Sequence, residues 1–164
     1  MREAGWNVQM RLTDILSLDC IAPRMSAADK TSAITEMVDL IAAAGKLLDR
    51  DLMLQAALER EATRTTGIGN GLAIPHGKSA AVGQLVMAVG RLGQPIDFES
   101  IDGKPVSIVI FLASPLDKTG PHIQALARIS RLMTDPDFRE ALETAETAEG
   151  ILDLIASSEA ELAN

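Results

Sequence analysis

Apolar side chains recur every three or four residues in five stretches of the chain, a spacing that places them on one face of an α-helix. Ser26 and Asp29 precede the first stretch in a capping arrangement, and Gly45 ends it. The pattern predicts helices after Ser26 and Asp29, after Asp49, from about His122, at Asp135-Pro136 and after Thr147. The apolar face is expected to include Leu54, Ala57 and Leu58 in the second helix, and Ile123, Leu126 and Ile129 in the third.

The middle of the chain contains strand patterns instead. Leu85–Val89 and Val106–Leu112 are apolar, and the second is so uniformly apolar that we expect both of its faces to be buried. Pro95 and Asp102-Gly103 lie between the two segments as turn signals. Helices, strands and helices in this order predict an α/β fold: a single domain with a central mixed β-sheet flanked by α-helices on both faces.

The length of 164 residues is enough for one self-sufficient hydrophobic core, so we expect one domain. A new apolar pattern starts at Met10, which predicts a domain over residues 10–160 and a flexible N-terminal extension over residues 1–9. The longest strongly apolar run, Ile108–Ala113, is too short to span a bilayer, and no secretory segment follows Met1. We therefore expect a cytoplasmic protein without direct membrane insertion.

Composition excludes several classes of function. The formal net charge is -8, and nucleic acid is bound through clustered lysine and arginine, so we expect no nucleic-acid partner. The only cysteine, Cys20, permits neither an intramolecular disulfide nor a multi-cysteine metal site. The only two histidines, His76 and His122, are distant from each other and from Cys20, which is not the spacing of a zinc site. No GxSxG motif is present, so a serine hydrolase is not predicted either.

The segment Gly67–Ser79, GIGNGLAIPHGKS, has the most distinctive composition in the chain. Its ending approaches the phosphate-binding pattern GxxxxGK[ST], but Leu72 stands where that pattern requires its first glycine. Pro75 also removes one of the backbone amides that such a loop directs at phosphate. Three alternating glycines at the start of the segment predict a tight turn with positive φ.

His76 is the strongest candidate for chemistry in this segment, although most isolated histidines are surface or core residues. Pro75 and Gly77 fix and expose the backbone on both sides of it, and Lys78 places a cation nearby. Phosphoryl transfer requires little beyond positioning and charge stabilisation. The arrangement therefore suits a histidine that accepts a phosphoryl group.

The sequence GIGNGLAIPHG resembles the active-site segment of the enzyme IIA proteins of the bacterial sugar phosphotransferase system, in the fructose/mannitol class and its nitrogen-regulatory branch. Further matching segments follow in the family's order across nearly the whole chain after Met10. They are Glu59-Arg60-Glu61, Ile96-Asp97-Phe98, Asp102-Gly103-Lys104-Pro105-Val106, Phe111-Leu112-Ala113-Ser114-Pro115 and His122-Ile123-Gln124-Ala125-Leu126. The resemblance implies an enzyme IIA type-2 domain.

The resemblance also implies roles for individual residues. His76 matches the family's phosphorylated histidine, His122 its second active-site histidine, and Arg60 an arginine that contacts the phosphoryl group. The binding residues expected around them are Thr66, Gly67, Gly69, Asn70 and Lys78. Arg64, Arg128 and Arg131 either line the mouth of the site or only add solubilising charge. No metal and no cofactor is expected, because cationic side chains and amides would take their place.

The function that the resemblance implies is that of a phosphohistidine phosphocarrier in the phosphoenolpyruvate-dependent phosphotransferase system, which accepts a phosphoryl group on His76 from an HPr-like protein. A regulatory, nitrogen-type role is favoured, in which target proteins respond to the phosphorylation state. One alternative is a fructose- or mannitol-type sugar-transport subunit that passes the phosphoryl group to a cysteine of an enzyme IIB. Another is a degenerate, non-phosphorylated binding module, against which the retention of His76, Arg60 and His122 argues.

Overall fold

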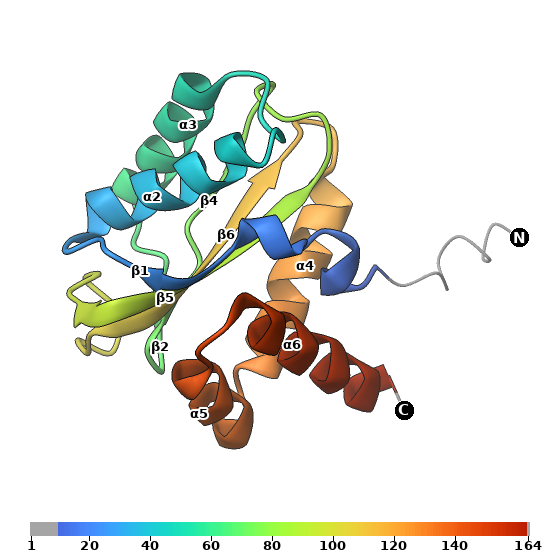
Figure 1. The fold of residues 1–164 in the computed structure, drawn as a ribbon. Coiled ribbons are helices and arrows are strands. Elements are labelled where there is room, and N and C mark those ends of the chain that lie inside the picture. The colour runs from blue at the N-terminus through green and yellow to red at the C-terminus, as the bar shows by residue number, and fades with distance from the viewer. Residues whose placement is uncertain (1–9, 164) are drawn as a thin grey trace, which may run out of the picture.

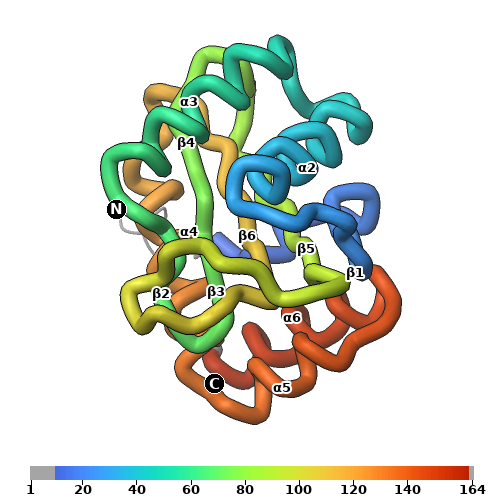
Figure 2. Tube along the Cα trace, turned by 90° about the vertical axis from the view of Figure 1, so that its left-hand side faces the viewer, coloured from blue at the N-terminus to red at the C-terminus, as the bar shows by residue number. Residues whose placement is uncertain are grey.

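The computed structural model describes residues 10–163, and within that range a six-stranded β-sheet lies between two groups of helices (Figures 1 and 2). The strands are β1 (Ile21–Met25), β2 (Gly67–Gly69), β3 (Leu72–Ala73), β4 (His76–Lys78), β5 (Val86–Ile96) and β6 (Val106–Ser114). The helices are α2 (Lys30–Ala43), α3 (Arg50–Thr63), α4 (Thr119–Leu132), α5 (Pro136–Thr144) and α6 (Ala148–Ala163), and two short 3₁₀ helices, η1 (Leu12–Asp14) and η2 (Leu18–Cys20), precede β1. The predicted extension over residues 1–9 lies outside the described residues.

The sheet is mixed, as the sequence pattern predicts. Its strand order is β1-β5-β6-β3-β2, with β5 antiparallel to β6, β2 antiparallel to β3, and the remaining pairs parallel. On the edge of β6 that faces away from β5, β3 lies beside Ile108–Val109 and β4 lies beside Leu112–Ser114. The two short strands are therefore one interrupted strand, with Ile74 and Pro75 at the interruption.

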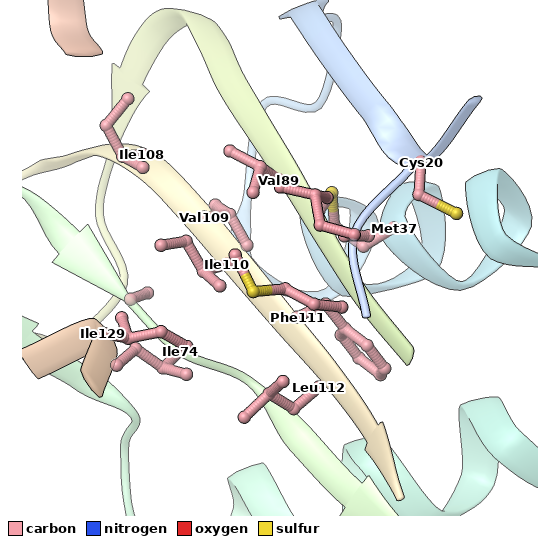
Figure 3. Close-up of a cluster of buried hydrophobic side chains, with 14 of the residues drawn as sticks. Cys20, Met37, Ile74, Val89, Ile108, Val109, Ile110, Phe111, Leu112 and Ile129 are labelled. Atoms are coloured by element: carbon pink, nitrogen blue, oxygen red, sulfur yellow. The ribbon is translucent and has the colours of Figure 1, made fainter. Parts of the chain in front are cut away.

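Helices cover both faces of the sheet, which confirms the predicted α/β arrangement. α2 and α3 pack on one face, and α4, α5 and α6 pack on the other (Figure 1). Every residue of β6 except Ser107 is buried, and its uniformly apolar sequence follows from this cover on both sides. Met37 of α2 and Ile129 of α4 both belong to the cluster of buried side chains around this strand (Figure 3).

Aspartate side chains begin three of the helices. Asp49 and Asp135 accept hydrogen bonds from the backbone of the first turns of α3 and α5, as predicted. The first predicted helix begins directly after Asp29, and its cap is Asp29 and not Ser26: the Asp29 carboxylate accepts the Ser32 N–H, and the Ser32 hydroxyl returns a contact to Asp29. The start of α2 is therefore fixed by a side chain adjacent to its first turn.

Two helices bury a face that differs from the predicted one. In α3, Leu54 and Leu58 are only half-buried, whereas Glu61 is buried. In α4, Ile123 is 58% exposed, and the preceding His122 is buried. In each helix a polar side chain with a hydrogen-bond partner occupies an inward position, which apolar periodicity does not reveal.

Proline residues account for two further differences from the predicted strands. β1 was not indicated by the sequence pattern because it contains Pro23, a residue that sheets tolerate mainly at their edges, and β1 is an edge strand. Pro95, predicted to mark a turn, lies in β5, where the pairing with β6 shifts register between Arg91 and Ile96. The irregular pairing at this point accommodates a residue without an N–H.

The predicted tight turn joins β2 to β3. Gly69, Asn70 and Gly71 have φ angles of 100°, 58° and 78°, the left-handed region that glycine and asparagine tolerate best. Gly67 serves a different purpose, because a Cβ at this position would lie 2.4 Å from Ser100 Oγ. Close approach of the two backbones, and not a turn, therefore requires the glycine at position 67.

We predict that Gly77→Ala destabilises the fold, because β4 packs directly against the backbone of α3. A Cβ at Gly77 would lie 3.0 Å from Met53 Cε and 3.2 Å from Ala57 N. Overpacking of this kind costs about 1–3 kcal/mol in the free energy of unfolding, which urea denaturation measures. Gly83→Ala is the matched control, because a Cβ there would meet no atom within 4 Å. Equal stability of the two variants would contradict the tight packing of β4 on α3.

Candidate functional site

The break between β3 and β4 determines the orientation of His76. Ile74 donates its N–H to Thr66 O (2.9 Å), while Pro75, which has no N–H, accepts a hydrogen bond from Leu112 N (3.2 Å). The carbonyl of Ile74 is left for the imidazole two residues later, and His76 Nδ1 lies 2.8 Å from this oxygen. A carbonyl oxygen only accepts hydrogen bonds, so Nδ1 carries the proton and Nε2 of the neutral ring keeps an unshared electron pair.

His76 is held in its neutral form near pH 7. Burial is the main influence that lowers its pKa below the ordinary value, and Arg60 and Lys78 act in the same direction. The hydrogen bond to Ile74 O and the charge of Glu61 oppose this lowering. A neutral imidazole with a free electron pair on Nε2 is the form in which histidine acts as a nucleophile.

His122, in the first turn of α4, provides the second imidazole. Its ring is buried, and the centroids of the two histidine rings are 5.1 Å apart, with 58° between the ring planes. Ser114, the last residue of β6, places its Oγ 2.5 Å from His122 Nδ1. Burial, followed by the proximity of His76 and Lys78, lowers the pKa of His122 to about 4. The two imidazole rings therefore lie in one site, and His76 contributes to the lowered pKa of His122.

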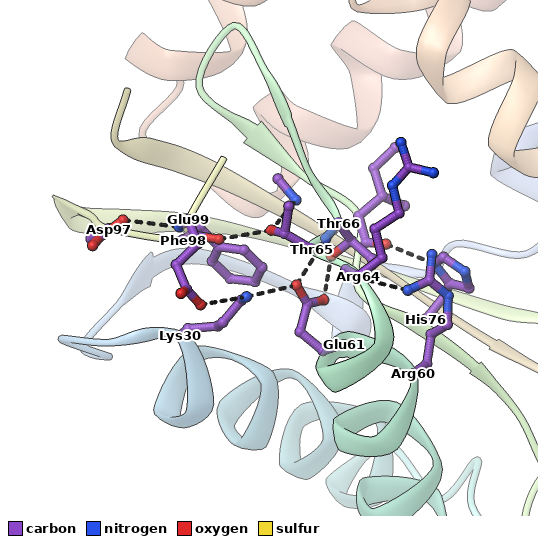
Figure 4. Close-up of polar contacts among 12 residues, drawn as sticks. Lys30, Arg60, Glu61, Arg64, Thr65, Thr66, His76, Asp97, Phe98 and Glu99 are labelled. Atoms are coloured by element: carbon purple, nitrogen blue, oxygen red, sulfur yellow. Dashed lines mark hydrogen bonds and ion pairs between the residues drawn. The ribbon is translucent and has the colours of Figure 1, made fainter. Parts of the chain in front are cut away.

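Arg60 reaches the same site from α3. This helix lies against β4, and the Arg60 side chain extends beside the His76 ring (Figure 4). Arg60 Nη1 donates to the carbonyl oxygen of Arg64 (2.8 Å), which holds the half-buried side chain in place. A guanidinium has five N–H donors in a fixed fork, so donors remain for an anionic ligand beside His76.

Glu61 anchors the segment that leads from α3 into β2. Its buried carboxylate accepts hydrogen bonds from the backbone N–H (2.8 Å) and the hydroxyl (2.5 Å) of Thr66. Lys30 Nζ lies 3.0 Å from the Glu61 carboxylate and 3.0 Å from that of Glu99, and it also lies over the ring of Phe98 (Figure 4). This network joins α2, α3 and the chain after β5 directly behind the histidine site.

Four residues that shape the site were not predicted as site residues: Lys30, Glu61, Ile74 and Ser114. Glu61 does have a sequence signal, since it follows the buried Ala57 by four residues on the same helix face. Ile74 contributes a backbone oxygen, which no side-chain motif indicates. The sequence positions of Lys30 and Ser114 do not reveal their partners, because strand pairing and helix packing bring those partners together.

Lys78 and Thr66, two of the predicted binding residues, lie close to the histidines. Lys78 Nζ donates to Thr119 Oγ1 in the first turn of α4 (2.9 Å), and its charge lowers the pKa of both histidines. Thr66 accepts the N–H of Ile74, which places it beside the strand break. That these two residues bind a ligand stays a prediction.

The other three predicted binding residues, Gly67, Gly69 and Asn70, shape the β2–β3 hairpin. Because β2 runs antiparallel to β3, the turn with Gly69 and Asn70 lies at the end of β3 opposite to His76. There Asn70 donates its N–H to Asp102 Oδ2 (3.1 Å). The structure therefore does not bring Gly69 and Asn70 together with the histidines.

The three further arginines have different surroundings. The carbonyl of Arg64 accepts the hydrogen bond from Arg60, which connects Arg64 to the site. Arg128 pairs with Glu159 of α6 (3.1 Å). Arg131 is exposed in the last turn of α4, whereas His122 is in the first turn of the same helix.

Positive side chains lie close to the histidines. Within residues 10–163, no group of three or more histidine, cysteine, aspartate and glutamate side chains is placed to hold a metal ion. No helix in the same part of the chain is long and apolar enough to cross a membrane. Arg60 and Lys78 are the charges that lower the pKa of His76, and such a convergence of cations favours an anionic ligand.

Known proteins are similar in sequence to this chain over most of its length. A family model described as "Phosphoenolpyruvate-dependent sugar phosphotransferase system, EIIA 2" matches residues 14–158. The chain is 36% identical over 149 residues to a nitrogen regulatory protein of Bradyrhizobium diazoefficiens, with 90% of this chain and 95% of the relative covered. It is 38% identical over 146 residues to the fructose-specific EIIABC component of Bacillus subtilis, a match that covers 89% of this chain and 23% of that longer relative.

Solved structures share the fold. The nitrogen regulatory protein IIA-Ntr of Neisseria meningitidis has a TM-score of 0.81 at 32% identity, with 87% of this chain and 97% of that chain covered. The mannitol enzyme IIA of Escherichia coli, solved in complex with phosphorylated enzyme IIB, has a TM-score of 0.75 at 22% identity, with 87% and 99% covered. Family model, relatives and fold define a phosphoryl-transfer component of the phosphotransferase system. More narrowly, the chain belongs to the type-2 enzyme IIA family.

We predict that His122 makes the fold less stable in mild acid. Its pKa of about 4 in the folded chain lies below the ordinary value of 6.5, so the unfolded chain takes up a proton first as the pH falls. The unfolding free energy is therefore highest above about pH 6.5 and falls as the pH approaches 4. The loss by pH 5 amounts to about 2 kcal/mol. Chemical denaturation at pH 7.5 and pH 5 measures this loss.

His122→Gln is the comparison variant, because it removes the titrating group and keeps a polar side chain of similar size. The drop in unfolding free energy between pH 7.5 and pH 5 should be smaller in this variant by about 2 kcal/mol. The same pH dependence in both proteins would show that folding does not lower the pKa of His122.

Proposed function

We propose that the protein is a phosphocarrier that accepts a phosphoryl group on His76 Nε2 from the phosphohistidine of an HPr-like donor protein. The observation that carries this proposal is the hydrogen bond from His76 Nδ1 to Ile74 O, which leaves the Nε2 electron pair free close to Arg60 and Lys78. Phosphoryl transfer needs a positioned nucleophile and groups that stabilise negative charge, and this site has both.

The transfer step requires no exchange of protons. The Nε2 electron pair of His76 attacks phosphorus, and the donor's N–P bond breaks as the new N–P bond forms. The donor imidazole leaves with the electron pair of the broken bond. The His76 ring, which then bears a proton on Nδ1 and phosphorus on Nε2, acquires positive charge, and the Ile74 carbonyl stabilises that charge through the Nδ1–H.

Side chains of the protein would stabilise the phosphoryl group in place of a metal or a cofactor. The group brings nearly two negative charges at neutral pH. Arg60 offers a planar fork of donors to its oxygens, and Lys78 offers a point charge at the rim. The ring of His122, whose centroid lies 5.1 Å from that of His76, is available as a neutral hydrogen-bond donor. No step of the proposed transfer depends on a bound cofactor.

The rim of the site suits a protein as the phosphoryl donor. Leu116 is 63% exposed and follows Ser114 by two residues. Ile123 is 58% exposed and directly follows His122. Apolar side chains beside cations fit a surface for transient docking of an HPr-like protein. The phosphoryl group would then pass to an enzyme IIB cysteine or change the binding of a regulatory target. Such a protein would work in the cytoplasm, which we propose as its location.

A regulatory, nitrogen-type role is favoured over sugar transport. It is supported by the greater similarity of the fold and sequence to IIA-Ntr than to the mannitol enzyme IIA. A transport subunit is the second candidate, supported by the identity to the fructose-specific component. A degenerate module that is never phosphorylated is the least favoured, because His76, His122 and Arg60 converge on one site.

We predict that phosphoenolpyruvate, enzyme I and an HPr-like donor together label the protein with one phosphoryl group that is labile in acid and stable in base. His76→Ala should abolish the label, because it removes the nucleophile, and radiolabelled phosphoenolpyruvate measures the transfer. Gly83→Ala, a substitution in open space, should label as the wild type does. An unlabelled wild type, or full labelling of His76→Ala, would contradict the phosphocarrier function.

We predict that Arg60→Ala slows transfer to His76 about ten- to a hundredfold, because hydrogen bonds to a charged group contribute about 1.5–3 kcal/mol. Arg60→Lys should keep part of the rate, since it retains the charge without the fork. Rapid-quench kinetics measure the rates. Arg131→Ala is the matched control, because it removes an exposed arginine from the far end of α4. Equal rates for Arg60→Ala and Arg131→Ala would exclude the proposed role of Arg60.

A further inference from the structure

We propose that Ser114 is a positioning residue that holds His122 in the tautomer with the proton on Nε2, opposite to the tautomer of His76. The inference rests on the proposed phosphocarrier function and assigns a task to a residue outside the predicted site. The two histidines would then be complementary: His76 presents an electron pair on Nε2, and His122 presents an N–H on Nε2.

The position of the Ser114 hydroxyl is fixed by the sheet. Ser114 is fully buried at the end of β6, in register with Lys78 of β4, and its carbonyl accepts the N–H of Ser79 (2.9 Å). Its Oγ lies 2.5 Å from His122 Nδ1, which is a short hydrogen bond between buried groups. Among residues 10–163, His122 Nδ1 is the hydrogen-bond partner of the Ser114 hydroxyl.

Two arrangements of protons are compatible with this contact when His122 is neutral. If His122 Nδ1–H donates to Ser114 Oγ, the hydroxyl proton of Ser114 is left buried without an acceptor. If the hydroxyl donates to Nδ1, that proton is paired, and the single proton of the imidazole resides on Nε2. Buried polar groups strongly favour the arrangement that leaves none of them unpaired. The second arrangement is therefore the favoured one.

The Nε2–H of His122 is the form that assists phosphoryl transfer. The Nε2 electron pair of His76 bonds to phosphorus, whereas an electron pair on Nε2 of His122 would repel the phosphoryl oxygens beside it. With the proton on Nε2, His122 donates a hydrogen bond to a phosphoryl oxygen while it stays neutral, and it gives up no proton in the step. Burial is the main cause that lowers the pKa of His122, with the proximity of His76 and Lys78 acting in the same direction, so the ring is neutral at pH 7.5.

Nitrogen NMR of the full chain with labelled histidine tests the tautomers directly. At pH 7.5 we expect the proton of His76 on Nδ1 and that of His122 on Nε2 in the wild type. Ser114→Ala should give His122 a mixture of both tautomers and leave His76 unchanged. A wild-type His122 with its proton on Nδ1 would overturn the proposal, and this reading depends neither on a variant that folds nor on phosphoryl transfer.

The kinetic test uses a double-mutant cycle. Ser114→Ala should slow transfer from the HPr-like donor about tenfold, and Ser114→Thr, which keeps the hydroxyl, should restore part of the rate. In the His122→Gln background the amide N–H donates regardless of Ser114, so Ser114→Ala should have no further effect there. An equal slowing in both backgrounds would show a merely structural role and overturn the proposal.

Ser107→Ala is the matched control for this cycle. It removes a serine from the same strand, whose hydroxyl donates to Glu143 (2.7 Å) and not to a histidine. The transfer rate of this variant and the NMR signals of its His122 should equal those of the wild type.

Failure of the proposed function would be recognised separately. A wild-type protein that takes up no phosphoryl label would refute the phosphocarrier function, while the NMR spectrum would still show the tautomers of His76 and His122.

Discussion

The Nδ1–H of His76 reaches the Ile74 carbonyl because Thr66, whose backbone lies beside Ile74, donates its N–H to Glu61 and not to that carbonyl. Ile74 donates its N–H to Thr66 O, and a complete antiparallel pair at this point would return the Thr66 N–H to the Ile74 carbonyl. Pro75 has no N–H to offer, and its fixed φ keeps the chain extended, so β4 returns to the sheet one residue later. The tautomer of the proposed nucleophile is thus determined by the backbone, and the remaining side chains of the site are arranged around it.

If His76 accepts a phosphoryl group as we propose, this acidic protein must hold a dianion beside it without repelling it. The nearest buried carboxylate, Glu61, is needed to fix the backbone and hydroxyl of Thr66 next to the strand break. Lys30 pairs with that carboxylate at 3.0 Å, so its negative charge is offset on the side away from the histidines. Arg60 and Lys78 add to the effect of burial in lowering the pKa of His76, while Glu61 acts in the opposite direction. The net charge of -8 therefore says little about this site.

The elements of the fold were predictable where a residue's local pattern decides its structure. The caps Asp49 and Asp135, the positive φ at Asn70 and the burial of both faces of β6 all follow from such patterns. The inward position of His122 was not predictable in the same way, because it depends on Ser114, which the sheet places beside it. Conversely, a motif groups residues by sequence, and the hairpin separates Asn70 from the histidine of the same motif.

The centre of the site is built from the rigid parts of the molecule, and this limits where functional diversity can arise. His76 belongs to a strand, His122 to the first turn of a helix, and Arg60 to a helix packed against the glycine that follows His76. Changes in these elements would disturb the nucleophile itself. Exposed side chains such as Ile123 are free to vary without that cost. Similarity both to a fructose-specific component and to a nitrogen regulatory protein is therefore compatible with one rigid core, and what selects the partner of this chain must be sought on the exposed surface around it.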